Sequence, residues 1–86
     1  RFHSVSIVTS DSGAADCLST TLFMLDYESG LKVIDAYRKE HPQEMLEAIW
    51  IMDQEQVPDN VENVHIVTQY AAVYTDGLKD ALVWPQ

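Results

Sequence analysis

The sequence predicts a small α+β domain in which a pair of helices covers one face of a mixed or antiparallel sheet of three to four strands. The main observation is the order of residue patterns along the chain, which runs strand, helix, helix, strand, strand. A length of 86 residues allows one modest hydrophobic core. The composition, 47% hydrophobic and 22% charged, is that of an ordinary globular protein. We therefore expect residues 1–86 to form a single domain.

The chain opens with a strand pattern followed by a helix signal. In "FHSVSIVTS", Val5 and Ile7 alternate with serines, as in a half-buried strand. "SDSG" then supplies turn residues and a helix N-cap, for which Asp11 and Ser12 are the candidates. We expect the first helix to run from about residue 13 to residue 25. Its predicted buried stripe is Ala14, Cys17, Leu18, Thr21, Leu22 and Leu25.

The second helix has a clear start and a clear stop. Asp26 can cap it, and the pattern extends over 27–40 until Pro42 ends it. Val33, Ile34 and Tyr37 are predicted to face inward.

The second half of the chain is predicted to be mainly strand. "LEAIWIM" (46–52) is apolar on both alternating faces, as expected of an interior strand. The β-rich stretch 64–75 forms either one long bent strand or two short ones. "TDG" (75–77) is turn chemistry, and "LKDALVW" closes the chain.

The charge balance excludes some partners. Fourteen acidic residues against five basic ones give a net charge of −9. Nucleic acids and anionic membranes require a positive surface, so neither is an expected partner. An excess of carboxylates is compatible with cation binding, but it more commonly serves only to keep a domain soluble.

Most of the potentially reactive side chains are predicted to be structural. Cys17 is the single cysteine, so no internal disulfide can form, and its place on the apolar stripe predicts a buried, inert thiol. The three histidines lie on separate elements without metal-ligand spacing, and each is expected to be a surface or strand histidine. We assign no catalytic or cofactor-binding residue.

Asp16 and Thr20 are the candidate site residues. They are four positions apart on the predicted first helix and therefore project from nearly the same side, one turn apart. A carboxylate and a hydroxyl placed in this way offer two hard oxygens of the kind that Mg²⁺ prefers. The alternative is that Asp16 is simply an acid near a helix start, where the helix dipole favours negative charge.

A longer stretch around these two residues resembles a known family. "SVSIVTSDSGAADCLSTTLFML" is similar to the segment of the FAD:protein FMN transferases (the ApbE family) that reads roughly S-V-T-V-I-A-x-(x)n-A-D-A-L-A-T-A-L-F-V-L-G. "ESGLKVID" looks like the second helix of that family, and "VYTDGLKDAL" resembles its ending. This chain departs from the family pattern at a few positions. Ser6 stands where the family usually has threonine, and Cys17 and Ser19 replace common alanines. The polar segment 53–63 is longer than expected for the family.

The resemblance implies a function. The magnesium-binding aspartate of the family falls on Asp16, and its partner threonine falls on Thr20. Members use Mg²⁺ to move FMN from FAD to a threonine of a target protein, and some hydrolyse FAD instead. The implied partners are FAD and a flavin-acceptor protein. The implied location is the cell envelope, with the parent enzyme anchored by a lipid.

The resemblance covers only the C-terminal quarter to third of such an enzyme. The chain starts at Arg1 without methionine, and the histidine-containing "H-I-I-D-P" segment of the family and most of its flavin pocket would lie upstream. We therefore expect a C-terminal part of an enzyme that is inactive by itself, with sheet edges open to homodimerisation or strand exchange. The alternative is a non-catalytic α+β interaction or scaffolding domain.

Overall fold

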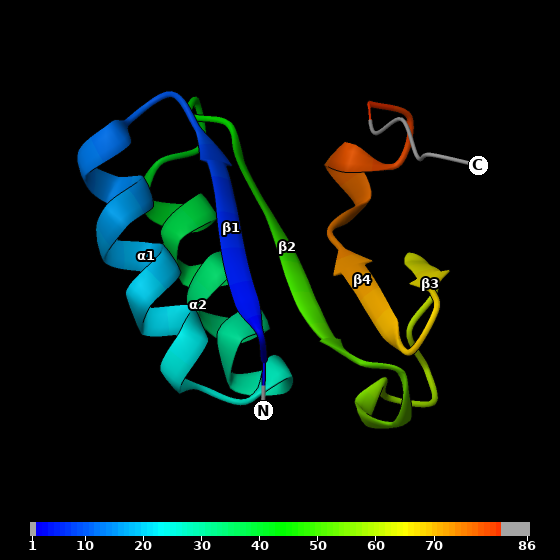
Figure 1. The fold of residues 1–86 in the computed structure, drawn as a ribbon. Coiled ribbons are helices and arrows are strands. Elements are labelled where there is room, and N and C mark those ends of the chain that lie inside the picture. Colours follow the sequence, from blue (N-terminus) through cyan, green and yellow to red (C-terminus); the bar gives the residue numbers. More distant parts are fainter. Residues whose placement is uncertain (1, 82–86) are drawn as a thin grey trace.

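The computed structural model describes residues 2–81 and confirms the α+β class. Its elements are β1 (Ser4–Thr9), α1 (Ser12–Met24), α2 (Tyr27–Glu40), β2 (Leu46–Asp53), β3 (Val64–Val67) and β4 (Tyr70–Tyr74), with short 3₁₀ turns η1 (Gln54–Gln56) and η2 (Asp76–Leu78). The four strands form one sheet in the order β1-β2-β4-β3, and every pairing is antiparallel. Both helices lie beside the β1–β2 half of the sheet, whereas β3 forms the opposite edge (Figure 1).

Side-chain caps fix the start of both helices. The Asp11 carboxylate accepts hydrogen bonds from the backbone N–H groups of Gly13 (3.0 Å) and Ala14 (3.2 Å), so the N-cap is the first of the two predicted candidates. Asp26 accepts from the N–H of Ser29 at 2.8 Å. This bond lowers the pKa of the Asp26 carboxyl, because it stabilises the ionised form. The predicted range 27–40 is confirmed, and α1 begins and ends one residue before its predicted range.

The hydrophobic core lies between the helix pair and alternate residues of the sheet. Trp50 on β2 is fully buried, and its ring meets Tyr27 edge to face at a centroid distance of 4.8 Å. Gly30 is also buried, and a Cβ there would lie 3.1 Å from Leu22 and 3.5 Å from Trp50, so glycine lets α2 approach the sheet closely. The other core residues are Ile34, Leu46, Ala48, Met52, Ala71 and Val73.

The stretch 64–75 resolves into the second of the two alternatives, a pair of short strands. β3 and β4 are joined by a tight turn at Thr68 and Gln69, and Thr68 has a φ of 56°, in the left-handed region. The predicted "TDG" turn is η2. The chain-closing segment "LKDALVW" is described only as far as residue 81, and its last residues lie outside the described range.

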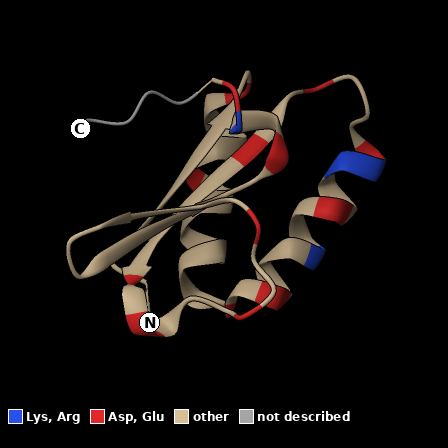
Figure 2. Cartoon of the chain, turned by 90° about the vertical axis from the view of Figure 1, so that its right-hand side faces the viewer, with Lys and Arg blue, Asp and Glu red and all other residues tan. Residues whose placement is uncertain are grey.

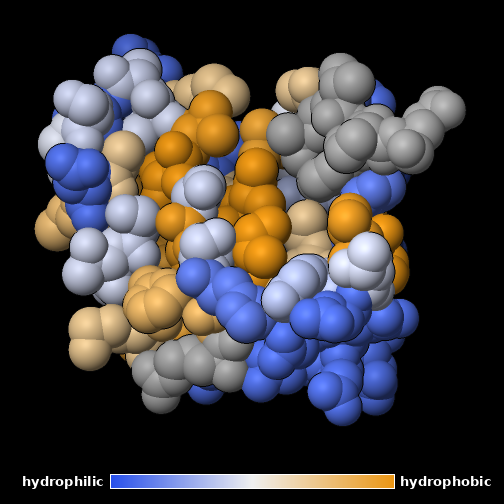
Figure 3. Space-filling model, viewed as in Figure 1, coloured by the Kyte–Doolittle hydropathy of each residue, from blue (hydrophilic) through white to orange (hydrophobic). Residues whose placement is uncertain are grey.

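The opposite face of the sheet has no covering layer in the described part of the chain. Ile49 and Ile51 of β2 point to this face, as does Val8 of β1, which pairs with Glu47 and is 37% exposed. Figure 3 shows apolar side chains gathered over β1 and β2 on this side of the molecule. Among residues 2–81, no helix combines the length and the apolar character that a membrane span requires.

Candidate functional site

Asp16 lies in the second turn of α1, and its side chain is exposed. In the described part of the chain its carboxylate forms no hydrogen bond or ion pair, so both of its oxygens are available to a ligand. The first turn of α1 contains no acidic residue, so Asp16 is beyond the position at which the helix dipole acts most strongly.

Thr20 is exposed one turn further along the same side of α1. Its hydroxyl donates to the backbone carbonyl oxygen of Asp16 at 3.1 Å, and Ser19 donates to the same oxygen at 3.2 Å. Because the hydroxyl proton of Thr20 is directed into the helix, the lone pairs of its Oγ1 stay available to a cation. The structure thus places the two predicted residues as neighbours with compatible donor chemistry.

Two oxygens do not complete a metal site. Within residues 2–81 there is no group of three or more histidine, cysteine, aspartate or glutamate side chains that could hold an ion. Mg²⁺ takes about six oxygen ligands and commonly keeps waters or shares substrate phosphates. α1 therefore supplies part of a coordination shell at most, and the remaining ligands would come from water, substrate or other protein segments.

The exposed side of α1 is unusually poor in charge. Asp16 is the one charged residue in α1, whereas α2 carries six: Glu28, Lys32, Asp35, Arg38, Lys39 and Glu40. The Lys and Arg residues of the described chain lie on α2, apart from Lys79 beyond η2 (Figure 2). Phe23 and Met24 of α1 are 40% and 67% exposed. Large apolar side chains exposed on a helix favour contact with other protein.

Two residues of the predicted α1 stripe do not face the core. Cys17 is an exposed free thiol, so the prediction of a buried thiol is wrong. Thr21 is also exposed, and its hydroxyl donates to the Cys17 carbonyl oxygen at 2.9 Å. The buried side is centred on Leu22, with Leu18 partly buried, and both belong to the predicted stripe. Spacing alone therefore identified the inner side through Ala14, Leu18, Leu22 and Leu25, but it wrongly included Cys17 and Thr21.

A polar network around Glu47 was not predicted. Its carboxylate Oε1 accepts from the Arg38 guanidinium at 3.0 Å, from the Thr75 hydroxyl at 2.5 Å and from the Gly77 N–H at 3.2 Å. A Cβ at residue 77 would overlap this carboxylate, so any other residue there would displace the Glu47 side chain. The network ties η2 to β2 and α2 and has a structural role. The "TDG" turn was the one sequence signal for it.

Two histidines form pairs with carboxylates at separate places. His3 lies 2.7 Å from Asp53. His41 lies 2.8 Å from Glu44, and its ring stacks on Tyr37 at 4.4 Å. Burial and the neighbouring Glu44 carboxylate raise the pKa of Tyr37, so its phenol stays protonated near neutral pH. Within residues 2–81, neither pair is joined by a third histidine, cysteine, aspartate or glutamate side chain that could hold an ion with it.

The cavities lie away from Asp16 and Thr20. Hollows of about 580 Å³ and 250 Å³ lie side by side near the start of α2, and neither candidate residue lines them. Comparison with models of protein families, with curated proteins and with solved structures found no match.

Proposed function

We propose that this chain is the C-terminal part of a magnesium-dependent flavin transferase that moves FMN from FAD to a threonine of a target protein. Asp16 and Thr20 would supply a carboxylate and a hydroxyl ligand to the metal. The observation that carries the proposal is that both side chains are exposed on α1. The Thr20 hydroxyl donates its proton to the Asp16 carbonyl oxygen, so the lone pairs of Thr20 Oγ1 and of the Asp16 carboxylate are available to a metal ion. This donor set fits Mg²⁺.

The surroundings of the two residues support a site completed by other protein. The exposed side of α1 around Asp16 is otherwise uncharged, and it includes the exposed Phe23 and Met24. Burial of these exposed apolar side chains by another protein segment is energetically favourable. In the proposed enzyme that segment lies upstream and contributes the flavin pocket, and the whole enzyme is lipid-anchored in the cell envelope. This chain by itself would not turn over FAD.

The negative charges of FAD and of this chain also favour a metal ion between them. FAD carries an anionic diphosphate, and this chain has a net charge of −9 with no Lys or Arg on α1. When bound there, Mg²⁺ would supply charge neutralisation to the diphosphate. Asp16 and Thr20 would hold the ion on α1 and so orient the diphosphate against it.

Metal binding by this chain alone provides a direct test. We expect Mn²⁺, a paramagnetic substitute for Mg²⁺, to bind weakly, in roughly the millimolar range, because only two protein ligands are available. In NMR spectra the strongest line broadening should fall on the amides around Asp16 and Thr20. Asp16→Asn should remove it, and Asp35→Asn, which removes an equal charge from α2, should not. Broadening centred elsewhere would contradict the assignment.

A second candidate function is a non-catalytic interaction or scaffolding domain. It is favoured by the open sheet: β1 pairs only with β2, β3 pairs only with β4, and the face beyond Ile49 and Ile51 is uncovered in the described residues. Exposed edge strands pair readily with a second chain. Under this proposal Asp16 would have no ligand.

Self-association tests the open sheet. We expect the elution volume in size-exclusion chromatography to decrease as the protein concentration rises, because edge strands and an apolar face associate. Val8→Lys places a charge on the edge strand β1 and should restore the monomer. Met45→Lys, at an exposed residue outside the strands, is the matched control. A monomer at every concentration would argue against this candidate.

A further inference from the structure

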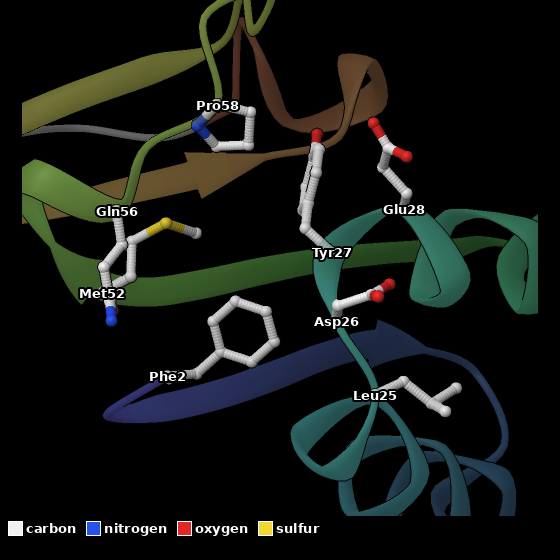
Figure 4. A pocket seen from close by; sticks show the side chains of 8 residues that line it. All are labelled: Phe2, Leu25, Asp26, Tyr27, Glu28, Met52, Gln56 and Pro58. Atoms are coloured by element: carbon white, nitrogen blue, oxygen red, sulfur yellow. The ribbon is translucent and has the colours of Figure 1, made fainter.

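The larger cavity lies where four chain segments meet. It has a volume of about 580 Å³, within the range of small-molecule sites. Phe2 before β1, Met52 near the end of β2, and Pro58 after η1 give it apolar walls, and the Tyr27 ring stands on the α2 side (Figure 4). The remaining lining residues are Leu25, Asp26, Glu28 and Gln56.

The described charged residues that line this cavity are acidic, and the charge of Lys32 acts on one of them, Asp26. Among residues 2–81, Asp26 and Glu28 line it, and no Lys, Arg or His does. The adjoining hollow of about 250 Å³ shares Tyr27 and Glu28 and adds Glu62 and Asp76, and none of the described residues that line it is a base. Lys32 lies one turn along α2 from Glu28, but no ion pair joins the two in the described part of the chain.

Tyr27 lines both hollows and contacts the core. Its ring packs against the buried Trp50 at 4.8 Å, and in Figure 4 its hydroxyl lies toward the same side as the Glu28 carboxylate. Burial, and secondarily the Asp76 carboxylate, raise the pKa of Tyr27, so the phenol stays neutral. The electron-rich face of a neutral aromatic ring attracts cations. A fixed ring beside a carboxylate thus favours a positively charged group at this position.

We propose that this cavity binds a small organic cation with an aromatic or aliphatic body. The body packs between Phe2, Met52 and Pro58, and the cationic group faces Tyr27 and Glu28. Anionic ligands are repelled by the four carboxylates and by the net charge of the chain. A bare divalent ion lacks three grouped ligands among residues 2–81. The cavity contains none of the residues of the proposed metal site, so each proposal can be tested independently of the other.

Three probes of one shape test the requirement for positive charge. In NMR titrations of the chain, phenethylammonium is expected to shift the amide resonances of Phe2, Tyr27 and Gln56. 2-Phenylethanol, which is neutral, should bind several-fold more weakly, and phenylacetate, which is anionic, should bind more weakly still. Equal affinity for the cation and the anion would overturn the proposal, as would shifts that lie outside the cavity or no binding at all.

A charge-removing variant tests the position of the cation. Glu28 is exposed, so Glu28→Gln should fold normally. It is expected to weaken phenethylammonium binding roughly threefold to fivefold, the effect of one partly exposed ion pair. Asp35→Asn removes an equal charge from α2 outside the cavity and should leave the affinity unchanged. If both variants weaken binding equally, the attraction comes from the net charge, and the proposed site is wrong.

Discussion

Under the proposed flavin-transferase function, replacing Asp16 by alanine in the complete enzyme is expected to abolish magnesium-dependent transfer of FMN. The variant removes the only anionic ligand that α1 offers, and the ion would lose its attachment to this helix. Loss of a metal that stabilises developing charge costs several kcal/mol, which lowers the rate at least about a hundredfold. Mass spectrometry of the acceptor protein, together with release of AMP, measures the transfer.

Folding can be separated from chemistry in this experiment. The Asp16 side chain is exposed and makes no hydrogen bond in the described part of the chain, so its loss should change the free energy of unfolding by less than about 0.5 kcal/mol. Asp35→Ala on α2 is the matched control and should transfer FMN normally. A variant at position 16 that keeps near-normal activity with Mg²⁺ would refute the catalytic proposal.

Local signals were sufficient to predict most of the fold. Asp11 and Asp26 cap the helices as expected. An N-cap side chain bonds to an N–H only two or three residues ahead, so the local sequence is sufficient to predict it. Pro42 follows the end of α2 for an equally local reason. The alternation of Val5 and Ile7 predicted β1, since period two requires no knowledge of the partner strand.

Features that depend on distant segments were harder to predict. Glu47 meets Thr75 and Gly77 because β2 lies between β1 and β4, and nothing within a few residues of Glu47 indicates that order. The exposure of Cys17 was missed because α1 is apolar on most sides and its periodicity is weak. The spacing of Asp16 and Thr20 places them on one side of α1, but spacing alone does not supply the remaining ligands of a metal.

Trp50→Ala is expected to destabilise the protein by about 3–5 kcal/mol, the largest effect of any single substitution in the core. Trp50 is fully buried on the central strand β2, and its ring contacts Tyr27 and the helix surface at Gly30. Alanine would leave a large void between α2 and the sheet. Small domains have roughly 5–15 kcal/mol of stability, so this loss leaves little margin. Urea denaturation followed by far-ultraviolet circular dichroism measures it.

Trp50→Phe separates packing from hydrogen bonding at the same position. The indole Nε1 is buried and has no hydrogen-bond partner among the described residues, and an unpaired buried donor costs about 1–3 kcal/mol. Phenylalanine keeps an aromatic ring against Tyr27 and removes that donor, so the two effects partly cancel and the loss should be less than half that of alanine. If Trp50→Phe lowered the free energy of unfolding as much as Trp50→Ala, the indole N–H would have a hydrogen-bond partner in solution. The core would then depend on that hydrogen bond and not on packing alone.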